Sequence, residues 1–297
     1  MTSDILSGED FTDRPVKKKS QFWAVVKQLF KNKTAVVGFV IVVILVLLAI
    51  LAPWIQPYEY TAINAEEAWQ GPSLRHLCGT DQLGRDMLSR LLIGSRYSLQ
   101  IGIWATLFGT LAGVIIGSIA GFFGGAVDEV IMRVTDVIQS IPGMILNVAI
   151  SAALGPGFVN CIIALAAGGV AGSARMMRAS ILGIRQMEYI NAAGLINCRD
   201  AKIIVKHLIP NAFAPMIVAA TMGIGGTIMQ ASGLSYLGLG VQAPTPEWGA
   251  MLSEGRNYLR RYPFMSIFPG LLIMITVLAF NLFGDGLRDA LDPKQKK

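Results

Sequence analysis

RMMRASILGIRQMEYINAAGLINCRDAKIIVKHLIPN, residues 175–211, is a basic stretch that lies between two long uncharged runs. Residues 137–174 carry no charged side chain before it, and residues 208–246 carry none after it. A bilayer core needs about 20 apolar residues per helix, and both runs exceed that length. If both runs lie in lipid, the stretch between them is a loop in water. We call it the basic loop, and Pro210 closes its helical pattern.

The composition places the whole chain in a membrane. Of its 297 residues, 53% are hydrophobic and only 15% are charged, whereas soluble domains carry roughly a quarter charged residues. The cysteines, Cys78, Cys161 and Cys198, lie far apart without a CxxC pair, which argues against a disulfide framework or a zinc site. We therefore predict an all-α polytopic membrane protein, and the net charge of +6 is read as topology rather than as nucleic-acid binding.

Six membrane-spanning helices are expected from the uncharged runs and their breaks. A kink is expected in the third, at Ile141-Pro142-Gly143. The polar segment 58–96, which includes a short amphipathic helix at 87–92, is placed outside the membrane. In chain order, the spans are expected at residues 34–57, 97–127, 128–153, 158–174, 212–232 and 264–283.

The distribution of basic residues predicts the orientation. Six spans place both termini on one side, and most of the 25 lysines and arginines then share that side with the basic loop. Because Lys and Arg concentrate on the cytoplasmic side, both termini are predicted to be cytoplasmic. Residues 1–33 form a cytoplasmic tail that either contains an interfacial helix or is simply solvated, and 287–297 form the other tail. The arginines of the first outer segment run against the rule: Arg75, Arg85, Arg90 and Arg96.

Four glycines in the second span recur every fourth residue. Small residues at this spacing line one face of a helix and let a second backbone approach closely, which matters in lipid because no hydrophobic drive brings helices together. We read them as helix-packing residues without a catalytic role: Gly109, Gly113, Gly117 and Gly121.

Charged residues gather at the start of the third span. Charges in the middle of a bilayer are costly, so this group is expected at the cytoplasmic boundary, with Arg133 one turn from Glu129 as an ion pair. Two interpretations stay open, a structural boundary and a role in gating. The group consists of Asp128, Glu129, Arg133 and Asp136.

Several kinds of catalytic chemistry have no counterpart in the sequence. There is no GxxxxGK[ST] loop to hold ATP phosphates, no HExxH, and only two histidines. No nucleophile–base constellation is visible, and the mid-membrane acids that carry protons in secondary transporters are missing. The sequence therefore predicts a transport subunit that is not an enzyme, binds no metal or cofactor itself, and takes its energy from a partner.

The basic loop is the expected place for that partner. Residues 187–197 and 200–208 have the pattern of two short helices, with Asp200 as the N-cap of the second. Small side chains near the start of the first helix, at Asn191, Ala192 and Ala193, would let it seat in a groove of another protein. From periodicity alone, an ordinary amphipathic loop helix is an equal alternative.

At this point the sequence resembles a known family. EYINAA from Glu188 and KHLIPN from Lys206 look like the EAA loop of binding-protein-dependent ABC importer permeases. Three further motifs are similar to the C-type subunit of the dipeptide/oligopeptide/nickel branch, and the resemblance covers residue 34 to the C-terminus. They are GTDQLGRD from Gly79, LSYLGLGVQAPTPEWG from Leu234 and GDGLRDALDP from Gly284.

The resemblance implies a type I ABC importer permease fold, with a core at 97–286 and a coupling loop at 175–211. It implies a heterodimer with a second permease subunit, two cytoplasmic ATPase subunits that bind ATP and Mg, and an extracytoplasmic substrate-binding protein. It also implies that the first loop helix couples to an ATPase, with Asn191 where the family has an acid and Asn197 where it has a glycine. The coupling residues are Glu188, Tyr189, Ile190, Asn191, Ala192, Ala193, Gly194 and Asn197, and the loop is closed by Asp200 and Pro210.

The resemblance further implies a multi-pass protein of a bacterial or archaeal cytoplasmic membrane, in contact with lipid and with no nucleic-acid partner. The expected function is to form half of a translocation pathway for dipeptides or oligopeptides. Nickel or a metal chelate is the alternative cargo. The alternatives from other classes are a stand-alone channel or secondary carrier, which would need buried ionisable groups, and a membrane scaffold without cargo.

Overall fold

In the computed structural model, which describes residues 21–188, 190 and 199–291, the regular structure is helical. Five continuous helical segments, α2, α3, α6, residues 200–236 and α11, are long and apolar enough to cross a membrane, and α4 with α5 makes a sixth if that bent pair is one span. The predicted all-α membrane class is therefore confirmed, and the span count is six when the bent pair is counted as one span. The helices are α1 (Gln21–Leu29), α2 (Lys33–Ile55), α3 (Met87–Phe123), α4 (Gly125–Ser140), α5 (Gly143–Leu154), α6 (Phe158–Arg185), α8 (Asp200–Ile203), η2 (Ile204–Leu208), α9 (Ile209–Tyr236), α10 (Trp248–Gly255) and α11 (Phe264–Leu291).

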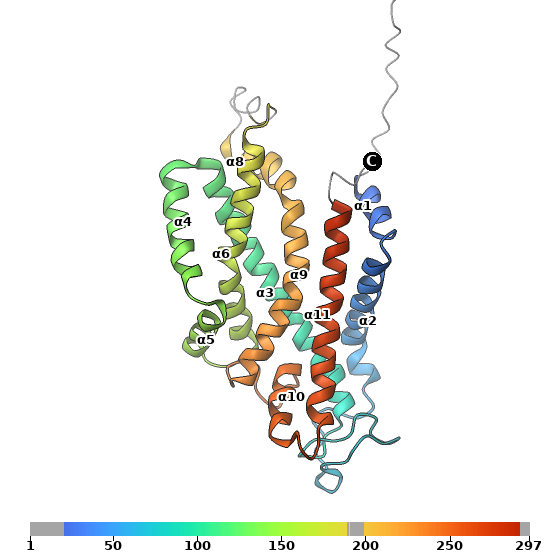
Figure 1. Ribbon diagram of the computed structural model, residues 1–297. Helices are drawn as coiled ribbons and strands as arrows, with labels where there is room; N and C mark the ends of the chain where they lie inside the picture. Colours follow the sequence, from blue (N-terminus) through green and yellow to red (C-terminus); the bar gives the residue numbers. More distant parts are fainter. Residues whose placement is uncertain (1–20, 189, 191–198, 292–297) are drawn as a thin grey trace, which may run out of the picture.

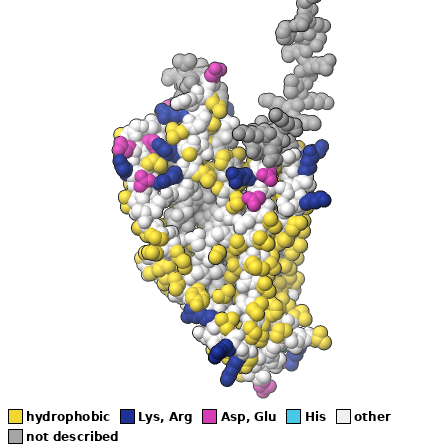
Figure 2. Space-filling model, in the orientation of Figure 1, with side chains coloured by type: hydrophobic (Ala, Val, Ile, Leu, Met, Phe, Trp, Pro, Cys, Tyr) yellow, Lys and Arg dark blue, Asp and Glu magenta, His cyan; other side chains and the backbone are white. Residues whose placement is uncertain are grey.

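The ends of the helices form two ends of the molecule (Figure 1). We call one the basic end, where α1, α8, the C-terminal end of α6 and the C-terminal end of α11 lie. The other is the loop end, where residues 56–86 and α10 lie (Figure 1). Charged side chains gather toward both ends of the face shown in Figure 2, and hydrophobic side chains cover much of the middle. This distribution is the one that a bilayer core imposes.

α2 is a peripheral helix beside α11, as its uniformly apolar sequence predicts (Figure 1). The side chain of Asn32 caps it by accepting hydrogen bonds from the backbone N–H groups of Thr34 and Ala35. Its close contact with α11 depends on Gly38, where a Cβ would come within 2.8 Å of the Ala279 carbonyl oxygen. The helix ends at Ile55 rather than at residue 57, and Pro53 lies inside its last turn.

The second span is longer than predicted. Residues 87–92 are not a separate outer helix, because α3 runs without interruption from Met87 to Phe123. Asp86 caps its first turn by accepting a 2.7 Å hydrogen bond from the backbone N–H of Ser89. The polar residues of this turn are paired with other groups inside the protein. They therefore do not need contact with water, and the helix can continue through this segment.

The third span breaks where Pro142 and Gly143 were expected to kink it. The break is sharper than a kink, because α4 and α5 are bent by 89° to one another. Pro142 cannot donate a backbone hydrogen bond, and a proline disfavours helical geometry at the residue before it, so Ile141 is extended. The turn at 154–157 and the start of the fourth span at Phe158 lie where they were expected.

The basic loop is shorter than the 37-residue loop predicted at 175–211. α6 continues to Arg185, eleven residues beyond the expected end of the span at Ala174. On the other side, residues 200–236 form one helical run through α8, η2 and α9. Asp200 is the first residue of α8 rather than its N-cap, a position that Arg199 takes. The corrected connection therefore covers residues 186–199, of which 189 and 191–198 lie outside the described residues.

Pro210 does not end the helical pattern as predicted, because it lies in the first turn of α9. η2 before it is a π-helix, in which the N–H of Ile209 donates to the Ile204 carbonyl, five residues back. Pro210 has no N–H and therefore donates no backbone hydrogen bond back into η2. The carbonyl of His207, near this proline, accepts a 2.6 Å hydrogen bond from the Asn211 side chain.

Candidate functional site

A cavity of about 240 Å³ lies between α3, α6 and α9 in the middle of the bundle. Its walls are built from small and neutral side chains, and none of its described lining residues is charged. The hydroxyls of Thr106 on α3 and Thr227 on α9 are 2.9 Å apart across it. The middle of the face in Figure 2 is correspondingly hollowed and pale. A neutral, hydroxyl-bearing wall can hydrogen-bond a passing solute without trapping it by charge.

The glycine row of α3 holds this cavity's walls together by letting α3 and α6 approach closely. A Cβ at Gly109 would come within 2.8 Å of the Ala166 carbonyl oxygen, and one at Gly121 within 2.8 Å of the Ile181 Cβ. Cβ atoms at Gly113 and Gly117 would overlap Ser173 and Ala174. All four glycines therefore face α6, and at each of them a side chain would push the two backbones apart.

At the basic end, the structure shows how one residue of the predicted coupling helix is anchored. Ile190 is only 6% exposed and belongs to a hydrophobic cluster built by α3, α6, α8, η2 and α9. Glu188, two residues earlier, is exposed. The cluster's buried members are Val114, Met177, Ile181, Ile190, Ile203, Leu208, Ala212 and Met216. Of the other predicted coupling residues, Tyr189, Asn191, Ala192, Ala193, Gly194 and Asn197 lie outside the described residues.

The charges at the start of the third span bind to α6. Arg178 makes a two-bond contact with Asp128, and Arg175 contacts Asp136. The predicted pair of Glu129 and Arg133 is present at 3.8 Å, with both side chains largely exposed. Arg175 and Arg178 were predicted to be loop residues, but the extension of α6 turns them into a clamp on α4. The sequence shows acidic residues in one segment and arginines in the other, which indicates that the two segments could pair. It does not indicate which residues would pair.

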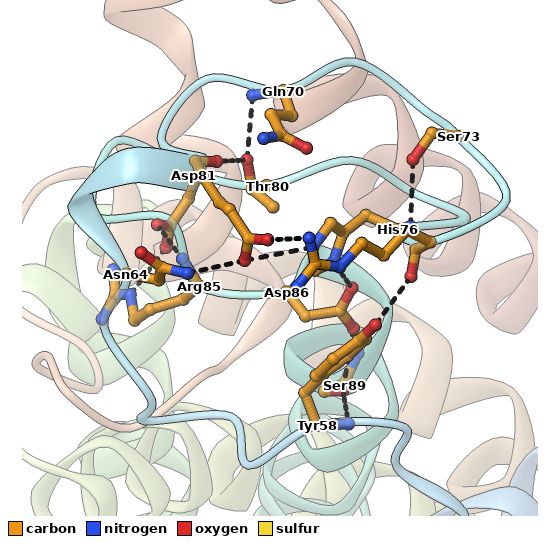
Figure 3. Close-up of polar contacts among 12 residues, drawn as sticks. Tyr58, Asn64, Gln70, Ser73, His76, Thr80, Asp81, Arg85, Asp86 and Ser89 are labelled. Atoms are coloured by element: carbon orange, nitrogen blue, oxygen red, sulfur yellow. Dashed lines mark hydrogen bonds and ion pairs between the residues drawn. The ribbon is translucent and has the colours of Figure 1, made fainter.

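The loop end contains a buried ionic network that sequence reasoning missed (Figure 3). Asp81 is fully buried and accepts hydrogen bonds from Arg85, at 2.6 Å, and from Arg90. Arg90 also contacts Glu254 of α10 at 3.0 Å, 164 residues later in the chain. Two acids and two arginines therefore neutralise one another, and they tie the start of α3 to α10. Buried charges persist only when paired in this way.

A second polar chain fixes the loop against α3 (Figure 3). His76 Nδ1 lies 2.9 Å from Asp86, the residue that caps α3, and the ring of Tyr58 lies 4.8 Å from the His76 ring. Arg75 pairs with Glu67 in the same loop. The positive φ of Gly84, +73°, keeps the connecting turn tight against the Asn64 carbonyl. The GTDQLGRD motif thus braces the first turn of α3 together with His76 and Arg90.

α10 was not predicted, since no helix was expected between the spans at 212–232 and 264–283. Glu247 is fully buried, caps α10 through the N–H groups of Gly249 and Ala250, and accepts a 2.9 Å hydrogen bond from Ser98 of α3. Trp248 is also fully buried and donates its indole N–H to the Leu91 carbonyl at 3.1 Å. The PEWG motif therefore locks α10 onto α3 at the loop end.

Comparison with known proteins agrees with these features. The family described as "Binding-protein-dependent transport system inner membrane component" matches residues 113–297. The family described as "N-terminal TM domain of oligopeptide transport permease C" matches residues 20–72. Together the two profiles cover most of the chain, including α2, α6, α9, α10 and α11.

Curated relatives match along nearly the whole length. The dipeptide transport system permease protein DppC of Alkalihalophilus pseudofirmus is 44% identical over 270 residues, which is 91% of this chain and 89% of the relative. The glutathione transport system permease protein GsiD of Escherichia coli O6:K15:H31 is 43% identical over 277 residues, 93% of this chain and 90% of the relative.

Solved structures match in fold. An inward-facing structure of the MetNI methionine ABC transporter has a TM-score of 0.56 at 19% identity, covering 69% of this chain and 98% of that chain. A crystal structure of an amino acid ABC transporter with histidines has a TM-score of 0.52 at 18% identity, covering 67% of this chain and 92% of that chain. The chain belongs to the family of binding-protein-dependent transport system inner membrane components, as a multi-pass permease subunit of an ABC importer.

Proposed function

We propose that this permease subunit forms half of a translocation pathway for short peptides, including dipeptides. We infer a peptide cargo from the similarity along nearly the whole chain to a dipeptide permease and a glutathione permease, both above 40% identity. The central cavity supports it, because hydroxyl and backbone groups suit a short peptide whose own groups are amides and balanced charges. Among the described residues of that cavity, no carboxylate, thiol or imidazole is present to hold a nickel ion.

The other half of the pathway comes from a second permease subunit in a heterodimer. Two ATPase subunits at the basic end bind ATP and Mg and hydrolyse the nucleotide, and a substrate-binding protein delivers cargo to the loop end. The protein lies in a bacterial or archaeal cytoplasmic membrane with both termini in the cytoplasm. Support for this orientation comes from the basic end, because α1, α8 and the end of α6 lie at the same end of the molecule (Figure 1) and each carries a Lys or Arg residue in its last turn.

The coupling helix at residues 187–197 transmits movement of the ATPases to the spans. The anchor for this transmission is Ile190, because its cluster joins α3, α6 and α9 in one apolar body. The Asp128–Arg178 contact extends that body to α4. A push on the coupling helix therefore moves the cavity walls together, which changes access to the cavity from one end to the other. The charges of α4 act as a structural link in this movement.

Cargo is tested by uptake in cells that lack the native gene and express this chain with its partner subunits. We expect uptake of a radiolabelled dipeptide that depends on the chain and is reduced by excess unlabelled dipeptide or glutathione. Uptake of radiolabelled nickel is expected to equal that of cells without the chain. Nickel uptake that depends on the chain, with no dipeptide uptake, would refute the peptide assignment.

Coupling is tested by replacing Ala193 with tryptophan in the complete transporter. A bulky side chain on the docking helix is expected to lower uptake and transport-coupled ATPase activity by at least about tenfold, which corresponds to about 1.4 kcal/mol of lost docking free energy. Membrane insertion should be unchanged. The matched control is Ala126→Trp, at an exposed position of α4. Wild-type uptake by the Ala193 variant would exclude docking at this position.

A further inference from the structure

The four arginines of the first outer segment, which contradict the positive-inside pattern, are not equivalent in the structure. Arg75 pairs with Glu67, and Arg85 and Arg90 pair with Asp81 and Glu254. Arg96, on α3, makes no ion pair or hydrogen bond with any residue that the structure describes. Three of the four positive charges are therefore neutralised within the protein. The charge of Arg96 is available to pair with an anionic group from outside the chain.

Arg96 lines a pocket of about 270 Å³ between the ends of α2 and α3. The α3 residues of this pocket follow the i, i+3, i+4, i+7 spacing of one helix face, and the others come from the end of α2 and the residues just after it. Unlike the central cavity, this pocket has a charged side chain in its lining. The lining residues are Pro53, Gln56, Tyr60, Ile93, Arg96, Tyr97 and Gln100.

A second polar group in the pocket also lacks a partner. The Gln56 side-chain oxygen, Oε1, is buried and accepts no hydrogen bond, while its Nε2 donates a long 3.4 Å bond to the Pro53 carbonyl. A buried acceptor without a donor is costly, so a turn of the Gln56 amide toward an occupant that supplies an N–H or O–H would stabilise it. A ligand that fits this pocket would therefore place an anionic group beside Arg96 and a hydrogen-bond donor beside Gln56.

The depth of the pocket in the membrane identifies the occupant. Pro53 and Gln56 mark the end of an apolar span, and Trp54 between them is 76% exposed, as tryptophans at the membrane–water boundary are. Next to the pocket, the α3 face continues from Gln100 to Trp104 and Phe108 at four-residue spacing, and the last two are exposed and stacked 5.6 Å apart. A headgroup in the pocket would therefore have its acyl chains against an apolar helix face.

We propose that this pocket binds the headgroup of a phospholipid at the loop end, with Arg96 on the phosphodiester and Gln56 accepting a hydrogen bond from a hydroxyl or ammonium of the headgroup. Guanidinium groups suit phosphate because their N–H groups match its oxygens. Phosphatidylglycerol and phosphatidylethanolamine carry such donors, whereas phosphatidylcholine has the phosphate but no donor. The site therefore distinguishes phospholipids by their headgroups.

The test is native mass spectrometry of the complete transporter after equilibration with vesicles of equal parts phosphatidylglycerol, phosphatidylethanolamine and phosphatidylcholine. Wild type is expected to retain the first two in preference to phosphatidylcholine. Arg96→Gln should reduce retained phosphatidylglycerol by at least about fivefold, in line with loss of a hydrogen bond to a charged group. The matched control Arg260→Gln, at an exposed position of the same end, should retain lipid as wild type does.

Gln56→Leu separates the two contacts. It is expected to remove the preference for donor-bearing headgroups while leaving retained phosphatidylcholine unchanged, because the phosphate contact survives. The proposal is overturned if Arg96→Gln retains the same lipid as wild type, which is also the result expected if a partner subunit covers the pocket. It is equally overturned if millimolar inorganic phosphate displaces the lipid, since the pocket would then be a site for free phosphate.

Discussion

Replacing Gly117 with alanine is expected to lower the stability of the transporter although it raises the intrinsic helix propensity of α3. The new Cβ would overlap the Ala174 carbonyl oxygen and lie 2.9 Å from the Met177 Cβ. The obstacle is backbone, so no side-chain rotation can relieve it. Overpacking of this kind costs about 1–3 kcal/mol, which exceeds the gain of up to about 1 kcal/mol from removing a helix glycine. The measurement is thermal denaturation of the detergent-solubilised complex followed by size-exclusion chromatography.

Gly183→Ala is the matched control for this prediction. Gly183 lies on α6, and a Cβ there would meet nothing within 4 Å. The same chemical change should therefore leave the melting temperature unchanged or raise it slightly. If the two variants melt together, the α3–α6 contact does not depend on the glycine row, and the close approach in lipid has another origin.

Replacing Arg90 with methionine is expected to have the largest effect of any single change at the loop end. The substitution leaves Asp81, fully buried, with only Arg85 as a cation, while Glu254 loses its closer partner. Removing one partner of a buried ion pair costs up to about 3–5 kcal/mol, and here two carboxylates are left to share the single guanidinium of Arg85. We expect poor yield of folded complex, a lower melting temperature and loss of uptake.

Arg133→Met provides the comparison for an exposed pair. Its partner Glu129 lies 3.8 Å away, and both side chains are more than two-thirds exposed, so the expected cost is at most about 1 kcal/mol. A double variant that adds Asp81→Asn to Arg90→Met restores the charge balance and should recover part of the lost stability. Equal melting temperatures for the two single variants would show that the buried network contributes no more than an exposed pair.

Both predictions concern α3, which connects the features of the molecule. Its first turns carry the ionic network and the contact with α10, its middle lines the cavity, and its C-terminal half packs on α6. The loop end and the cluster around Ile190 at the basic end are thus joined by one helix of 37 residues. This continuity gives the coupling movement that we propose at the basic end a direct path to the loop end.

The sequence by itself determined the features that depend on neighbouring residues. Uncharged runs located the spans, Pro142 and Gly143 located the break in the third, and the spacing of the α3 glycines identified a packing face. Each of these is local, because hydropathy, proline geometry and helical periodicity act within a few turns of the chain. The motifs that identified the family are local in the same sense, since each is a short run of adjacent residues.

The tertiary structure alone decided which distant groups meet. Arg90 and Glu254 are 164 residues apart, and Arg178 and Asp128 are 50 apart, so nothing in the periodicity of either segment pairs them. These partners also explain the corrected helix bounds. α3 begins ten residues before the predicted start of its span, and α6 ends eleven residues after the predicted end. The charged side chains of these extra turns are buried or paired in the protein, so they do not require a loop in water. The energy of a charge depends on what surrounds it in space, and for that reason the lengths of these helices were set by the fold.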